Sequence, residues 1–192
     1  MCAAIPVTTP SRCLLDAASW EIPDTEDQMA LTLAVLQQGL TRPRDVHREP
    51  RYARRNHTLG VSQGVAAFER GAWSRPEAVL GELFDGSNVL PHVCLNTRLV
   101  LPGGSVRVPD GYVREVALAI QVHSRTYHAR EEYWQRTVEA DTDLTRAGVV
   151  VLGVTPQTLY DTGESFLRDV EQTAAKLHGR PLPDIAIRSR CC

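Results

Sequence analysis

The stretch from residue 130 to residue 155 constrains the fold more than any other part of the chain. Residues 130–147 have the apolar spacing of an amphipathic helix, and Gly148 follows where such a helix would end. VVVLGVT (149–155) is a nearly uninterrupted apolar run, which is typical of a strand buried on both faces. Because another apolar segment, 112–122, precedes the helix, the pattern predicts two parallel strands joined by a helical crossover.

Three segments ahead of this crossover read as consecutive strands. The turn sequences PGG and PDG separate them, and they cover NTRLVL (96–101), SVRV (105–108) and YVREVALAIQV (112–122). A helix with an S-x-x-E start, Ser74 to Glu77, precedes them, and a last helix is predicted to begin near Asp161. The expected order is α-β-β-β-α-β-α, which makes the chain an α/β protein.

The chain divides into three predicted parts: a helical N-terminal region (1–70), an α/β domain (71–179) and a loose tail (180–192). A chain of 192 residues can bury a core without disulfides or metal. Its five cysteines match no zinc pattern, and there is no signal peptide or long apolar run. These features favour the reduced cytoplasm and argue against a membrane protein.

A basic run, RPRDVHREPRYARRNH (42–57), stands out in a chain whose net charge is −2. Its six arginines outnumber Asp45 and Glu49, which leaves a local charge of +4. The prolines predict a loop followed by a helix over about 51–70. Phosphate contact and a merely solvated helix face both fit this pattern. The candidate DNA contacts in the run are Arg42, Arg44, Arg51, Arg54 and Arg55.

Polar residues at the end of the third predicted strand interrupt an otherwise apolar segment. Alternation places Leu118 and Ile120 on one face, toward a core, and Gln121 and His123 on the other. Both polar residues lie at the carboxyl end of the strand, where the sites of α/β sheets gather. A binding or catalytic site and a hydrogen-bonded polar pair without a metal are both open.

The polar residues occur in a recognisable order. Ser74 and Glu77 open a helix, Asp110 stands in VPDGYV, Gln121 and His123 follow eleven and thirteen residues later, and VLGVTP closes the series. From Glu77 to Leu177 this order resembles the PD-(D/E)XK nuclease-like superfamily. The nearest relatives are bacterial proteins akin to the very-short-patch repair endonuclease. Some of these carry an N-terminal region like that of type IV toxin–antitoxin antitoxins, which residues 14–70 resemble more weakly.

The resemblance implies a restriction-endonuclease-like core (αβββαβ, mixed sheet) and a site for DNA hydrolysis with Mg²⁺ or Mn²⁺. Asp110 and Gln121 would be the metal ligands, and Arg125 would contact DNA beside them. The catalytic set implied by the resemblance is Glu77, Asp110, Gln121, His123 and His128. The family pattern has Glu at position 121 and Asp or Lys at position 123. An amide supplies oxygen without charge, and imidazole suits zinc or manganese better than magnesium.

We therefore expect a nuclease-related, DNA-associated protein with a degenerate metal site and a binding or regulatory, antitoxin-like role. Its expected partners are DNA, a cognate toxin or a second copy of the chain. The alternative is a metal-dependent endonuclease in which Asp110 and Gln121 hold the ion while His123 or His128 acts as base or ligand. Simpler roles also stay open: Asp110 suits a tight turn, Glu77 a capping box and His128 a helix start.

Overall fold

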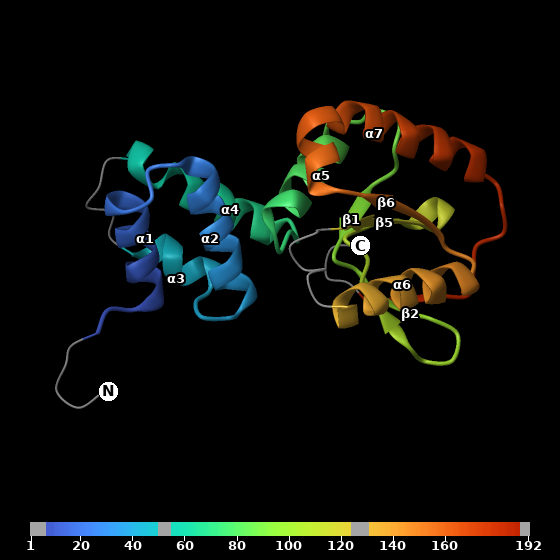
Figure 1. Ribbon diagram of the computed structural model, residues 1–192, viewed down its shortest axis with the longest axis horizontal. Coiled ribbons are helices and arrows are strands. Elements are labelled where there is room, and N and C mark those ends of the chain that lie inside the picture. Colours follow the sequence, from blue (N-terminus) through green and yellow to red (C-terminus); the bar gives the residue numbers. More distant parts are fainter. Residues whose placement is uncertain (1–6, 50–54, 124–130, 189–192) are drawn as a thin grey trace. The chain divides into compact units, whose positions relative to one another are not determined.

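The computed structural model describes residues 7–49, 55–123 and 131–188, with the backbone alone at 55–56 and 131–133. The chain forms two compact units, Met1–Arg75 and Pro76–Cys192 (Figure 1). Within the described residues, every helix is too short or too polar to cross a bilayer.

The described residues of the first unit form helices and the turns between them. Its elements are α1 (Pro10–Trp20), α2 (Thr25–Gln37), α3 (Pro43–Arg48), the 3-10 helix η1 (Arg55–Thr58) and α4 (Leu59–Glu69). The side chains of Thr9 and Asp24 accept backbone hydrogen bonds at the starts of α1 and α2, which explains where both helices begin. The helix expected over about 51–70 is shorter in the structure, where α4 begins only at Leu59, after η1.

A buried cluster joins the helices of the first unit. It comprises Leu14, Leu15, Ala18, Leu36, Val46, Val61 and Val65. Helices α2 and α4 are in close contact at Gly60, where a Cβ atom would lie 2.1 Å from the carbonyl oxygen of Thr25. A glycine is therefore required at that contact.

The second unit contains two small sheets. The first is mixed, in the order β1 (Val93–Leu95), β4 (Gly111–Val113), β5 (Leu118–Val122) and β6 (Val150–Val154). Only its β5–β6 pair is parallel, which confirms the predicted crossover through α6 (Glu131–Arg146). The second sheet has the order β3 (Val106–Arg107), β2 (Arg98–Val100), β7 (Ala186–Arg188).

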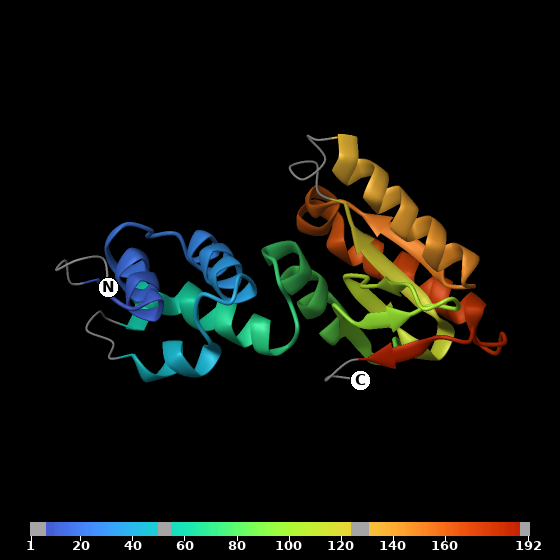
Figure 2. The same cartoon turned by 90° about the horizontal axis from the view of Figure 1, so that it is seen from below.

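Helices cover both faces of the mixed sheet (Figures 1 and 2). Helices α5 (Arg75–Asp85) and α7 (Pro156–Leu177) pack on one face, where Leu118 and Ile120 are fully buried with Leu80 and Val170. On the other face Ala117 and Ala119 lie against Leu144 of α6 and residues of the second sheet. Strand β6 is half-buried rather than buried on both faces. The α/β class is confirmed.

The segment predicted as one strand, 112–122, is in fact a hairpin. Strands β4 and β5 pair antiparallel, and the 3-10 turn η2 (Arg114–Val116) separates them. The turn ends at Ala117, which has a left-handed φ of 47°. Arg180 stabilises it by donating hydrogen bonds to the carbonyl oxygens of Val116 and Ala117, at 2.8 and 2.9 Å. The alternation of apolar and polar residues within 112–122 cannot predict this contact, because Arg180 is distant in the sequence.

Three further features differ from expectation. Strand β7 pairs with β2, so the segment expected to be a loose tail belongs to the fold up to Arg188. Helix α7 begins at Pro156, five residues before the predicted Asp161, with Thr155 accepting a hydrogen bond as its N-cap. Cys94 on β1 is buried and disulfide-bonded, which differs from the expectation of reduced thiols.

Candidate functional site

Asp110 directly precedes β4, and the antiparallel pairing of β4 with β5 places it beside the carboxyl end of β5. The β4–β5 register pairs Gly111 with Ile120, and one more step along it places Asp110 opposite Gln121. The Oδ2 atom of Asp110 accepts a hydrogen bond from the backbone N–H of Val122 at 2.6 Å. The structure thus brings together the two residues expected to form a metal site, and it ties the carboxylate of one of them to the strand.

Glu77 reaches the same region from α5. It is 8% exposed, and its Oε2 atom accepts a hydrogen bond from the side-chain amide of Asn96. Asn96 has a left-handed φ of 48°, a conformation that asparagine tolerates better than most residues, and its N–H donates to the carbonyl oxygen of Asp110. Asn96 therefore links Glu77 to Asp110.

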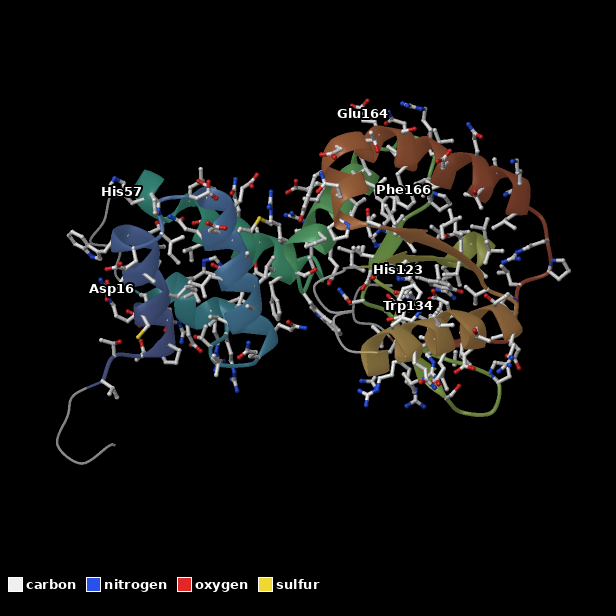
Figure 3. The ribbon with its side chains drawn as sticks, in the orientation of Figure 1. Asp16, His57, His123, Trp134, Glu164 and Phe166 are labelled. Atoms are coloured by element: carbon white, nitrogen blue, oxygen red, sulfur yellow. The ribbon has the colours of Figure 1, made fainter. Side chains whose placement is uncertain are left out.

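His123 points from the end of β5 toward α6, whereas Phe166 of α7 lies on the opposite side of the sheet (Figure 3). The His123 Nε2 atom lies 3.6 Å from Oδ2 of Asp141 on α6. The imidazole ring rests on Gly153 of β6, where a Cβ atom would come within 2.7 Å of it. Two neighbouring elements therefore hold the ring.

Burial and neighbouring carboxylates raise the proton affinity of Asp110. Burial raises the pKa of Asp110 to about 7, and the negative charges of Glu77 and Asp141 add to the rise, whereas the hydrogen bond from Val122 opposes it. Burial also raises the pKa of Asp141, and His123 opposes this. Carboxylates collected in this way favour a proton, a cation or a basic ligand.

The described residues do not fit the divalent metal that the resemblance implies. Within the described ranges, no group of three or more His, Cys, Asp or Glu side chains is arranged to hold a metal ion. Asp110 and Glu77 each accept a hydrogen bond from the protein, and Gln121 is uncharged. An octahedral Mg²⁺ site would need several of these oxygens turned to one point.

The structure does not place the remaining predicted residues relative to this cluster. His128 and Arg125 lie outside the described residues, as do Arg51 and Arg54, and the same holds for the side chain of Arg55. Arg42 and Arg44 belong to the first unit. Their roles as DNA contacts, like the catalytic roles of the cluster residues, stay predictions.

Two residues of the cluster, Asp141 and Asn96, were not predicted from the sequence as site residues. Asp141 shares one side of the predicted helix with Leu144, which is fully buried, and an acid among such neighbours is a signal for a site. Asn96 falls inside the predicted strand 96–101, and its left-handed backbone leaves no trace in the alternation of apolar residues.

Comparisons with known proteins assign no function to this site. No family model matches the chain, and no curated protein and no solved structure matches it either.

Proposed function

We propose that the chain is a nuclease-related protein that binds DNA without cleaving it, in a regulatory, antitoxin-like role. Its domain after residue 70 would be a restriction-endonuclease-like core whose metal site has degenerated. The antitoxin-like part rests on the sequence resemblance alone.

One observation carries the proposal: each carboxylate near the end of β5 has a protein partner at one of its two oxygens. Asp110 is bonded to Val122, Glu77 to Asn96, and Asp141 faces His123. At position 121, where the resemblance expects a further acid, the chain has an amide. The order of α5, an antiparallel strand pair, α6 and a parallel strand also supports a core of this type.

The DNA-binding part of the proposal rests on the first unit. A groove of about 520 Å³ is lined by Arg42 and Arg48, with Asp45 and Glu49 also at its wall. The side chain of Arg44 is 62% exposed, and its ion pair with Asp45 is 3.6 Å long. An exposed pair of this kind contributes little to stability, so a DNA phosphate can compete for the arginine.

A binding assay with the full-length chain tests this. We expect fluorescently labelled duplex DNA to bind, with an affinity that falls as salt rises. The double variant Arg42→Ala/Arg44→Ala should lower the slope of log affinity against log salt by about one for each phosphate that the variant no longer binds. Arg98→Ala, which removes an exposed arginine on β2 of the second unit, is the matched control. Equal binding by both variants would remove the first unit as the DNA-binding surface.

A cleavage assay separates this proposal from the endonuclease alternative. Supercoiled plasmid should stay intact with the wild-type chain in Mg²⁺ and in Mn²⁺. Cleavage that disappears in Asp110→Ala would overturn the proposal and establish a working nuclease site. Cleavage that persists in Asp110→Ala would point to a contaminating enzyme, and the binding proposal would stand.

A further inference from the structure

Strand β6 holds both the backbone and the side chain of His123, which is more constraint than a surface histidine usually has. The backbone N–H of His123 donates to the carbonyl oxygen of Val154 at 2.7 Å, which continues the β5–β6 ladder past its last residue pair. The ring lies on Gly153, and any larger residue there would displace it. The backbone and one side of the ring are therefore placed by β6.

Asp141 faces another part of the ring. Its side chain is 27% exposed and lies one turn before Leu144, which is fully buried. The Oδ1 atom of Asp141 is buried without a hydrogen-bond partner among the described residues, while Oδ2 lies 3.6 Å from Nε2 of His123. A half-satisfied carboxylate is costly inside a protein, and such groups are retained where they serve a function.

The contact also constrains the chemistry of the ring. In a neutral imidazole one nitrogen carries hydrogen and the other a lone pair. A lone pair on Nε2 would face the negative carboxylate and be repelled by it, whereas an N–H at Nε2 would be attracted. Asp141 therefore favours the form with hydrogen on Nε2.

We propose that Asp141 is a positioning residue, which orients the His123 imidazole and sets which of its nitrogens carries hydrogen in the neutral ring. The resemblance assigns no role to Asp141, and the proposal depends on the contact between α6 and the end of β5. The orientation and tautomer of His123 would then be set before it contacts nucleic acid at this site. This consequence rests on the proposed function.

Long-range ¹H–¹⁵N spectra of the full-length chain, recorded at pH 8, test the first part. We expect the His123 ring of the wild type to show hydrogen on Nε2. Asp141→Asn keeps an acceptor oxygen and should preserve this pattern, whereas Asp141→Ala should shift the ring toward a mixture of both forms. Asp143→Asn is the control, because Asp143 lies on the same helix and pairs with Arg107 instead. An unchanged pattern in Asp141→Ala, with a folded chain by circular dichroism, would overturn the proposal.

A double-mutant cycle tests the consequence for binding. His123→Ala and Asp141→Ala should each weaken DNA binding several-fold, and the double variant should be no weaker than the worse single variant. Fully additive effects would contradict the positioning role. Should the wild type bind no DNA, the proposed function fails, and the spectra decide the role of Asp141 by themselves.

Discussion

The two units of the chain each contain a polar cluster, and the two clusters differ in how fully their hydrogen-bonding groups are paired. In the first unit Gln28 is 2% exposed, and its amide donates to the carbonyl oxygens of Ala18, Ile22 and His57 at 2.7 to 3.0 Å. Its oxygen accepts from the N–H of Gly60 at 3.2 Å. In the second unit Asp110 and Asp141 are ionisable groups with raised pKa values, and Oδ1 of Asp141 has no hydrogen-bond partner within the described ranges.

This difference separates a structural cluster from a candidate site. A neutral amide whose hydrogen-bonding groups are all used stabilises the junction of helices and has no capacity left for a ligand. Ionisable groups that lack a full set of hydrogen bonds or opposite charges reduce stability. Their presence in a folded protein therefore points toward a ligand or a role in recognition. Substitutions in the two clusters should therefore have effects of different size and, for one residue, of opposite sign.

The largest effect should come from Gln28→Ala. The substitution leaves one buried and two part-buried carbonyl groups and the N–H of Gly60 without their partner, and it opens a cavity. We expect a loss of about 4 kcal/mol in the free energy of unfolding of the first unit. Urea denaturation followed by circular dichroism measures this. The control Gln37→Ala, at an exposed position of α2, should change stability by less than about 0.5 kcal/mol.

Gly60→Ala should be next in size. The new methyl group would lie 2.1 Å from the carbonyl oxygen of Thr25, which is backbone and cannot turn aside. We expect a loss of about 3 kcal/mol despite the better helix propensity of alanine. Gly163→Ala in α7 is the matched control, because its methyl group would meet Leu83 at an ordinary 3.6 Å. A Gly60→Ala chain as stable as the control would show that α2 and α4 can separate freely.

Asp110→Asn should stabilise the chain, and the gain should depend on pH. Because the pKa of Asp110 rises from 3.8 to about 7 on folding, the folded state holds a proton that the unfolded state releases between these values. Wild-type stability therefore falls as pH rises through this window. Asparagine carries no charge, and its oxygen can still accept from Val122.

We expect Asp110→Asn to be more stable than the wild type by about 2 kcal/mol at pH 8, and the gain should nearly vanish only below the unfolded-state pKa of 3.8, at about pH 3. Urea titrations at both pH values measure it. Asp85→Asn, at an exposed position on α5, should show no such difference. A loss of stability at pH 8 would mean that a positive charge compensates the Asp110 carboxylate in solution.

Sequence patterns predicted the fold of the second unit better than they predicted its candidate site. The amphipathic spacing of α6 and the apolar run of β6 are local, so they predicted the parallel β5–β6 pair. The β4–β5 hairpin was missed because Arg180 stabilises the turn at Ala117 from 63 residues away. Asp110 opposite Gln121 could be predicted from spacing, whereas the His123–Asp141 contact depends on how α6 packs on the sheet.

The smallest effect on stability should come from Gly153→Ala, which is the counterpart of Gly60→Ala in the candidate site. Here the new methyl group would meet the imidazole of His123 at 2.7 Å, and a side chain can rotate away where a backbone cannot. We expect a loss below about 1 kcal/mol together with a clear change in the NMR signals of the His123 ring. A ring unchanged by this substitution would mean that Gly153 does not hold it. A loss as large as that of Gly60→Ala would mean that the His123 ring cannot rotate away and is held as firmly as backbone. The α2–α4 contact at Gly60 and the candidate site at His123 would then not differ in how far they can adapt.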